Sequence, residues 1–282
     1  MTPRVTVVRG SEYLRLATTL LQRMRLAGPS GGIWEAADVQ WWSRQGRGTD
    51  ADGQAFWLAR GEPVAAVIRT GFGPSVQCDV LVGRGGDNDV VWAEALRRAD
   101  AETEFPVRDD DTPTLAALID AGYRADGPPV VASWLPAADR PPVPPLAAGF
   151  RLLSRADAPD SAHPLVARNG PDVAAHLQRC SLYRPELDLK VLAPDGQVAG
   201  YGLFWADPVT GVGLVEPMRT EAGFQRRGIA SHVLATGLEL LAQRGCQRLK
   251  VSSDIPLYLR AGFQPIASAT ATVYSCRISP RL

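Results

Sequence analysis

Apolar residues along the chain recur in short runs, and breaks that contain glycine or proline separate them. Residues 2–8 form a valine-rich run typical of a strand, and an apolar pattern of helical spacing follows as far as Leu21. Two further pairs of apolar runs, within 56–68 and 189–204, each enclose a turn that contains glycine. Such a turn between apolar runs is typical of a β-hairpin, so one hairpin is expected in each half of the chain.

The two halves also end alike. Residues 115–123 and 255–263 each predict a short helix that stops at a glycine, the usual left-handed residue at a helix C-terminus. A strand is expected after each helix, over 130–135 in the first half and over 271–278 in the second. The opening strand recurs at 150–153, although prolines weaken the helical pattern behind it. This repeated order indicates a tandem duplication of one α+β unit; two unrelated domains that share the landmarks by chance are the alternative.

A proline-rich stretch separates the halves. At 282 residues the chain is long for a single core, which favours two domains. Residues 136–145 contain five prolines, which fix φ and remove backbone donors, so an extended and rather stiff connector is expected. The sequence therefore predicts a first domain over 1–135, a linker over 136–148 and a second domain over 149–282.

The segment with the clearest chemical signal runs from residue 211 to 263. Residues 212–219 predict a strand disturbed near Pro217, because proline cannot donate to a sheet ladder and marks a bulge or a splayed edge. A turn leads into a helix that is expected to stop at Gly245, and a strand is expected over 246–251. The apolar stripe of this helix consists of Ile229, Val233, Leu234, Leu238 and Leu241.

The start of this helix suits an anion. The first N–H groups of a helix have no partner within it and lie at the positive end of the helix dipole. Gly228 lets a ligand approach the backbone closely, and Arg226 and Arg227 add positive charge. A phosphate or pyrophosphate is the ligand that this combination favours.

The same stretch resembles the pyrophosphate-binding signature of the GNAT superfamily of N-acetyltransferases, Gln/Arg-x-x-Gly-x-Gly/Ala. The signature is complete here, as Gln225, Arg226, Arg227, Gly228, Ile229 and Ala230. Residues 257–263 resemble the second landmark of the family, Leu-Tyr-x-x-x-Gly-Phe, although the stretch before them is shorter than is common there. The two landmarks together are far more specific than the signature alone. The resemblance implies an α+β protein of two GNAT-like domains, each a mixed, mostly antiparallel sheet flanked by helices.

The resemblance implies direct transfer of an acetyl group to a primary amine, with acetyl-CoA as co-substrate and no metal. In the family the splayed strand contacts the pantetheine arm and the thioester through its backbone, and Met218, Arg219 and Thr220 stand at the corresponding positions. Tyr258 stands where the family's tyrosine bonds the CoA sulfur and protonates the departing thiolate. A phenol keeps its proton at neutral pH, which suits this task. A tyrosine that only packs against the core is the alternative.

Glu216 is the candidate general base. It precedes Met218 by two residues on the splayed strand, where a half-desolvated carboxylate can accept the ammonium proton directly or through water. A carboxylate that orients the acceptor, or one that merely pairs with Arg219, is the alternative.

The first half carries a degenerate copy of the signature. Counting on from Arg84 puts Asp87 and Asp89 where the two small residues belong, and two carboxylates at a helix start repel a pyrophosphate. Alignment of the terminal glycines puts Leu118 at the position of Tyr258. The first half is therefore expected neither to bind CoA nor to catalyse, and to shape or cover the acceptor cleft.

Composition narrows the remaining choices. Lys+Arg and Asp+Glu each total 30, so no nucleic-acid surface over the whole molecule is expected. Four widely spaced cysteines, expected to be reduced and buried, and three histidines without ligand spacing predict no metal site. No stretch approaches the roughly 20 apolar residues that span a bilayer, and a cytoplasmic monomer or homodimer is expected. No residue selects the small-molecule or peptide acceptor; a non-catalytic CoA sensor and a structural protein are the alternative functions.

Overall fold

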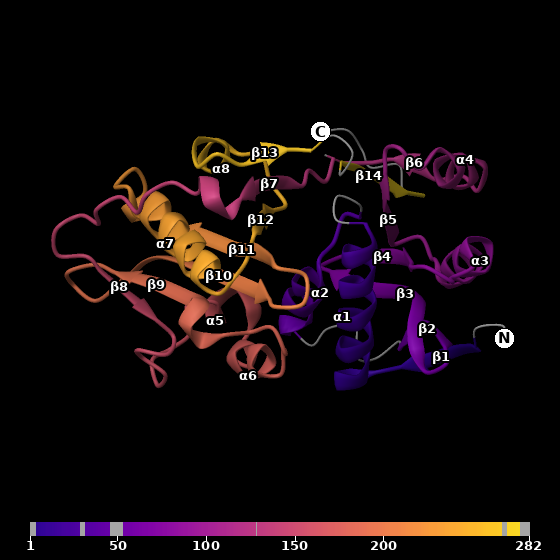
Figure 1. Ribbon diagram of the computed structural model, residues 1–282, viewed down its shortest axis with the longest axis horizontal. Coiled ribbons are helices and arrows are strands. Elements are labelled where there is room, and N and C mark those ends of the chain that lie inside the picture. Colours follow the sequence, from indigo (N-terminus) through magenta and orange to yellow (C-terminus); the bar gives the residue numbers. More distant parts are fainter. Residues whose placement is uncertain (1–3, 29–31, 46–52, 128, 267–269, 277–282) are drawn as a thin grey trace. The chain divides into compact units, whose positions relative to one another are not determined.

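The computed structural model describes residues 4–28, 32–45, 53–127, 129–266 and 270–276. The chain divides into two compact units, of which unit 1 comprises 1–131 and 267–282 and unit 2 comprises 132–266. Each unit holds one seven-stranded sheet flanked by helices (Figure 1). The α+β class and the two similar units expected from the repeated sequence pattern are confirmed.

Unit 1 has the strand order β1-β2-β3-β4-β5-β14-β6. Its strands pair antiparallel except for the parallel pair β4–β5. Helices α1 and α2 lie on one side of the sheet, and α3 and α4 lie on the other (Figure 1). The elements are β1 (Arg4–Val8), α1 (Gly10–Ala27), α2 (Ala36–Trp42), η1 (Ser43–Gln45), β2 (Gln54–Ala59), β3 (Glu62–Phe72), β4 (Ser75–Val82), α3 (Asn88–Arg98), β5 (Thr103–Arg108), α4 (Thr112–Asp120), β6 (Arg124–Ala125) and β14 (Ala271–Ser275).

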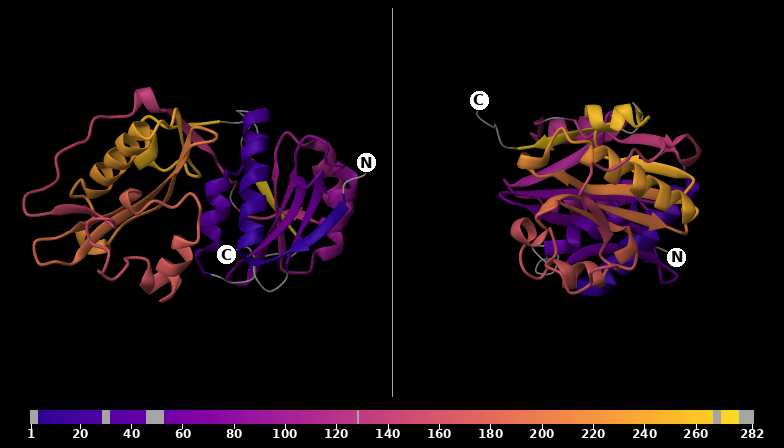
Figure 2. Two further views of the ribbon diagram at one scale, coloured as in Figure 1. Left: turned by 60° about the horizontal axis from the view of Figure 1, so that its bottom comes forward. Right: turned by 90° about the vertical axis from the view of Figure 1, so that its left-hand side faces the viewer.

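Unit 2 repeats this order as β8-β9-β10-β11-β12-β7-β13, with β11–β12 as its parallel pair. The long helix α7 lies along one face of the sheet (Figures 1 and 2). The elements are β7 (Ser133–Pro136), η2 (Ala137–Asp139), β8 (Arg151–Ser154), α5 (Val166–Asn169), α6 (Val173–Gln178), η3 (Pro185–Leu187), β9 (Asp188–Leu192), β10 (Val198–Asp207), β11 (Val212–Thr220), η4 (Ala222–Phe224), α7 (Ile229–Gln243), β12 (Arg248–Val251), α8 (Pro256–Arg260) and β13 (Gln264–Pro265). Both predicted hairpins, β2–β3 and β9–β10, are present.

The two halves of the chain exchange one strand each. Strand β7 follows the first half in sequence but pairs with β12 and β13 of unit 2. Strand β14 follows the second half but pairs with β5 and β6 of unit 1. The sequence-based boundaries at 135 and 149 therefore differ from the structural division. The apolar pattern predicts that a strand exists, but it does not name the strand's partner.

The proline-rich segment packs onto unit 2 instead of standing free as a connector. Arg140 Nε donates to Glu239 of α7 at 2.7 Å, and His232 Nδ1 lies 2.7 Å from the carbonyl oxygen of Pro144. Ala137 belongs to the core cluster of unit 2. The prolines give an extended path, and these contacts hold it along α7.

The opening of the second half differs from that of the first. Helix α1 has 18 residues, whereas β8 is followed only by the short helices α5 and α6. Pro159 and Pro164 lie before α5, and proline cannot continue a helix because it lacks the backbone donor. The short helices after β8 thus agree with the weakened helical pattern in the sequence after residue 153.

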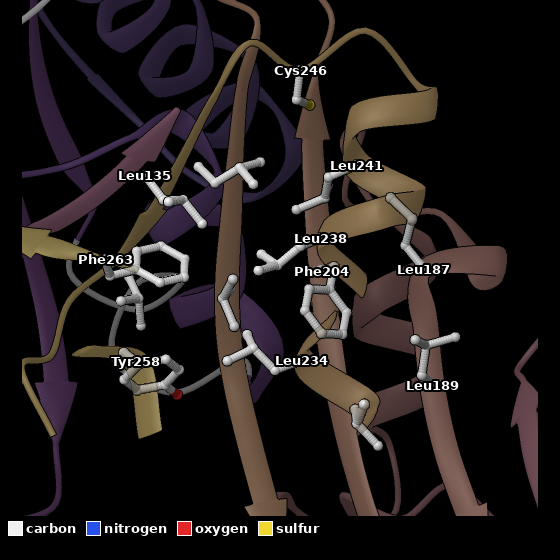
Figure 3. Close-up of a cluster of buried hydrophobic side chains, with 14 of the residues drawn as sticks. Leu135, Leu187, Leu189, Phe204, Leu234, Leu238, Leu241, Cys246, Tyr258 and Phe263 are labelled. Carbon is white, nitrogen blue, oxygen red and sulfur yellow. The ribbon is translucent and has the colours of Figure 1, made fainter. Parts of the chain in front are cut away.

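The core of unit 2 forms between α7 and the sheet. The predicted stripe is buried, and Figure 3 shows Leu234, Leu238 and Leu241 directed toward the sheet around Phe204 of β10. A Cβ atom at Gly237 would lie 2.1 Å from the Phe204 ring. The helix approaches β10 this closely because Gly237 has no side chain, and α7 is thereby fixed against the strand beside β11.

Candidate functional site

Strands β11 and β12 separate after a short parallel contact. They pair only from Val212 to Leu214 on β11, while β11 continues to Thr220. On its other side, β11 contains a bulge, since Glu216 and Pro217 together oppose the single residue Leu203 of β10. The sequence predicted a disturbance at this proline. The divergence leaves backbone groups of β11 beyond Leu214 without a ladder partner on the β12 side.

The turn before α7 has the geometry of an anion site. Gly228 is the N-cap residue with φ 77°, a left-handed conformation that suits glycine, and no side chain caps the helix. Arg226 also has a positive φ, 61°. The first N–H groups of α7 therefore point out of the helix end without a capping acceptor.

A cavity of about 470 Å³ opens at this helix end. It is lined by Thr220, Phe224, Gln225, Arg226, Gly228, Ile229, Ala230, Ser231, Leu257 and Arg260. Five of the six signature residues are among them. Arg227 is not, and its guanidinium lies 5.8 Å from the centre of the Phe224 ring. Arg260, one turn after Leu257 on α8, adds a cation that the sequence pattern did not single out.

The end of β11 reaches this cavity through Thr220. The hydroxyl oxygen of Thr220 is buried and has no hydrogen-bond partner in the structure. Met218 is half-buried and Arg219 is exposed. The Arg219 guanidinium donates to Glu221 at 3.2 Å, and Arg168 also pairs with Glu221. The contacts that the sequence analysis expects between these two residues and acetyl-CoA would therefore come from their backbone groups.

Tyr258 and Glu216 lie close enough to interact. Tyr258 is 7% exposed, and its ring lies 6.0 Å from that of Phe263 (Figure 3). Burial raises the pKa of the Tyr258 phenol, and the Glu216 carboxylate raises it further. The phenol therefore keeps its proton at neutral and moderately alkaline pH.

A buried polar network that the sequence analysis did not predict contacts the backbone of Glu216. The indole of Trp205 donates to the Glu216 carbonyl oxygen at 2.8 Å. The ring of Trp205 lies 6.2 Å from that of Tyr183, whose hydroxyl donates to Asp188 at 2.7 Å. His163 Nε2 lies 2.8 Å from the same carboxylate oxygen. The network joins the segment before β9 to the bulge in β11.

The tautomer of His163 follows from its neighbours. The backbone N–H of Leu165 donates to Nδ1 at 3.2 Å, so Nε2 carries the proton that Asp188 accepts. Asp188 and Lys190 alternate with apolar residues along buried β9. Charged residues at every second position of an apolar strand were the available signal for this network.

The other two histidines and the four cysteines are not among the residues of this network. His232 binds the proline-rich segment, and His176 lies 2.8 Å from the Arg179 guanidinium. Within the described ranges, no three side chains of His, Cys, Asp or Glu are grouped as ligands for a metal ion. Cys78, Cys180 and Cys246 are buried as expected, whereas Cys276 is exposed. No described helix combines the length and apolarity needed to cross a bilayer.

Unit 1 differs from unit 2 at the corresponding helix start. Asp87 is the N-cap of α3, and its carboxylate accepts the Val90 N–H at 3.3 Å. The chain's own carboxylate thus lies where an anion would bind. Leu118 stands at the position of Tyr258. The Leu118 carbonyl oxygen accepts the Tyr123 N–H at 2.9 Å, just as the Tyr258 carbonyl oxygen accepts the Phe263 N–H at 3.1 Å.

Comparison with known proteins supports this description. Residues 153–263 match the model of the acetyltransferase (GNAT) family. A stretch of 127 residues is 32% identical to a mycothiol acetyltransferase of Clavibacter michiganensis subsp. michiganensis, covering 38% of this chain and 41% of that protein. The chain therefore matches less than half the length of this curated relative.

Solved structures share the whole fold. A tandem GNAT protein from the clavulanic acid biosynthesis pathway superimposes with a TM-score of 0.66 at 17% identity, covering 99% of this chain and 100% of the other. A GCN5-related N-acetyltransferase from Sphaerobacter thermophilus superimposes with a TM-score of 0.61, also at 17% identity, covering 99% and 98% of the two chains. At this identity the likeness establishes the fold of both units.

Proposed function

We propose that unit 2, whose residues 153–263 match the acetyltransferase (GNAT) family model within a fold shared with a tandem GNAT protein, transfers an acetyl group from acetyl-CoA directly to a primary amine. The observation that carries this proposal is the arrangement along β11. The strand passes the Tyr258–Glu216 pair and ends at Thr220, in the cavity at the start of α7. A donor with a reactive thioester at one end and a pyrophosphate at the other fits such an arrangement.

The pyrophosphate is assigned to the turn at residues 225–230. The uncapped N–H groups of α7 supply donors, and Arg226 and Arg260 supply charge at the cavity wall. Backbone groups of Met218, Arg219 and Thr220 are assigned to the pantetheine arm and the thioester.

The chemistry follows from Tyr258 and Glu216. The neutral amine nitrogen attacks the thioester carbonyl carbon, the carbon–sulfur bond breaks, and Tyr258 donates its proton to the leaving thiolate. The attacking nitrogen loses its second proton as the amide forms, and that proton returns the phenol to its neutral form. The raised pKa of Tyr258 keeps that proton in place until the thiolate forms. Glu216 accepts the proton that the ammonium loses, directly or through water, or it orients the ammonium. The acceptor is a small molecule or a peptide.

Thiol release tests the proposal. The purified chain is incubated with acetyl-CoA and a panel of amino acids, polyamines, amine-bearing antibiotics and peptides with free N-termini, and the acetylated product is identified by mass spectrometry. Release of CoA thiol that depends on one amine supports the proposal. Tight acetyl-CoA binding without turnover on any amine would instead make unit 2 a sensor.

Glu216→Gln distinguishes the two roles of the carboxylate. A base must be ionised, so wild-type kcat/KM should fall as the pH falls through the pKa of the base. If Glu216 is that base, the variant loses or shifts this acidic limb. Glu239→Gln, which removes a carboxylate from the same unit on α7, serves as the control. An unchanged pH profile together with a raised acceptor KM assigns the orienting role.

Calorimetry of the intact chain is expected to give one acetyl-CoA per chain. Unit 1 is excluded because Asp87 fills the helix start that an anion would need. The intact chain is required, because cutting it at the proline-rich segment into fragments 1–140 and 146–282 would leave the first fragment without β14 and the second without β7. A stoichiometry of two would contradict the assignment of donor binding to unit 2 alone.

A further inference from the structure

Unit 1 contains a cavity of its own, of about 450 Å³. Residues of α1, β4, α3 and β5 form its wall, and the indoles of Trp34 and Trp92 contribute to it. This volume lies in the range of pockets that hold small molecules. Nothing in the function proposed for unit 2 uses it.

A buried carboxylate faces this cavity. Asp79 of β4 is 2% exposed and lines the wall. Its Oδ1 accepts from the Trp34 indole at 2.8 Å and from the Gln77 amide at 2.9 Å, and its Oδ2 accepts from the same amide at 2.9 Å. Two carboxylate oxygens offer about four acceptor positions. One position on Oδ2 therefore remains for a donor in the cavity.

Asp79 stands at the position that Glu216 has in unit 2. Parallel pairing ends at Gln77 in unit 1 and at Leu214 in unit 2, and each carboxylate lies two residues further along its strand. Unit 1 has lost the anion-binding helix start and the tyrosine, but it has kept a carboxylate where the strands part. On the function proposed for unit 2, the carboxylate that would meet an amine has a counterpart in unit 1, and the groups that would meet acetyl-CoA have none there.

Asp79 is the charged group best placed to act as counter-ion for a ligand, because the other charged groups around the cavity form ion pairs, lie exposed or bond the backbone. Arg25 of α1 forms a buried ion pair with Glu35, and Arg108 of β5 pairs with Asp110. The remaining charged groups around the cavity are Arg84, in the exposed turn after β4, Asp111, which caps α4, and Asp38 on α2, which accepts the Glu35 N–H. Among the described wall residues there is no histidine or lysine.

From this geometry we infer that the cavity of unit 1 binds a small organic amine as its ammonium ion, with the Asp79 carboxylate as counter-ion and Trp34 and Trp92 beside it. Carbonyl groups of β4 beyond Gln77 have no ladder partner on the β5 side and supply further acceptors. Indole faces attract cations. Unit 1 is thus an amine-binding module that performs no acyl transfer.

Ionisation of Asp79 makes this binding depend on pH. Burial raises the pKa of Asp79 to about 7, and the charge of Asp38 also raises it. The hydrogen bonds from Gln77 and Trp34 act in the opposite direction and lower this pKa. The carboxylate is mostly neutral at pH 6 and mostly ionised at pH 8. An amine that stays protonated at both pH values should therefore bind roughly tenfold more tightly at pH 8.

The indole N–H of Trp34 reports on the site directly, because it donates to Asp79. The intact chain is labelled with ¹⁵N-tryptophan, and benzylamine and its neutral analogue benzyl alcohol are titrated at pH 6 and pH 8. Trp34→Phe assigns the resonance, and the Trp205 indole, bonded to the Glu216 carbonyl oxygen, monitors unit 2. The expected result is a saturable Trp34 shift with benzylamine, tighter at pH 8, and binding at least tenfold weaker for the alcohol.

Asp79→Asn should abolish the preference for the amine, while the Asn carbonyl can still accept from Trp34. Equal responses to the amine and the alcohol would overturn the inference and leave an apolar pocket. A Trp34 shift caused by acetyl-CoA in the absence of an amine would also overturn the inference, because the cavity would then bind the acetyl donor. Tyr258→Phe separates the two proposals, since it should lower turnover in unit 2 by roughly 10- to 1000-fold and leave the Trp34 titration unchanged.

Discussion

Tyr258→Phe is expected to lower kcat by roughly 10- to 1000-fold while the affinity for acetyl-CoA changes only a few-fold. The reason is that the wild-type phenol is buried beside Glu216, and both features raise its pKa. It therefore keeps its proton at neutral pH, where it can hydrogen-bond the departing thiolate and share that proton with it. Phenylalanine keeps the ring and its contact with Phe263 and lacks that proton. Steady-state kinetics and calorimetry measure the two quantities.

The matched control is Tyr123→Phe. Tyr123 and Tyr258 are each 7% exposed, so both substitutions alter a tyrosine whose ring packs in the core of its own unit. Tyr123 lies in unit 1 and should leave kcat unchanged. Because the phenol of Tyr258 stays protonated, the loss in its variant should be nearly constant from about pH 7 to 9. Wild-type turnover in Tyr258→Phe would reduce this residue to a packing role.

Gly228→Glu is expected to abolish acetyl-CoA binding. A carboxylate at the N-cap of α7 would take the place of the pyrophosphate and repel it. No atom lies within 4 Å of a Cβ built at Gly228, so the protein has room for the side chain. Its cost to the fold is the left-handed φ of 77°, about 1 kcal/mol for a non-glycine residue. Calorimetry on the folded variant measures the loss.

Two controls separate charge from strain at Gly228. Gly228→Asn introduces a residue that tolerates the left-handed conformation without adding charge, and it should retain measurable binding. Gly85→Glu places the same side chain at the corresponding turn of unit 1, where φ is 91°, and should bind acetyl-CoA as the wild type does. Unchanged affinity in Gly228→Glu would place the anion elsewhere.

Local features of the fold could be predicted from the sequence, because local chemistry determines them. The stripe on α7, the bulge at Pro217, the glycine at the start of α7 and the two hairpins each follow from residues close together in the chain. Five signature residues line one cavity for the same reason, since a turn and the helix behind it form one local unit. Arg227 is the exception, and its guanidinium lies over the Phe224 ring instead.

Features that depend on distant segments could not be predicted. The pairing of β7 with β12 is a choice between two sheets that offer similar apolar edges. The contacts of Asp188 join it to His163, 25 residues earlier, and no periodicity encodes such a pair. Asp79 gave no local signal either. Its inferred role depends on where the β4–β5 pairing ends and on the indole of Trp34, which is 45 residues away in the chain.

The exchanged strands have a consequence for synthesis on the ribosome. Strand β14, which lies between β5 and β6, is the last described strand of the chain. When the first half emerges, its sheet has an open edge at β5, and that edge stays open until the second half and then β14 have been synthesised. The nascent first half must therefore avoid pairing that edge with other chains while the second half is made. Neither unit is complete as a product of its own half, so the two halves are obliged to mature together as one polypeptide.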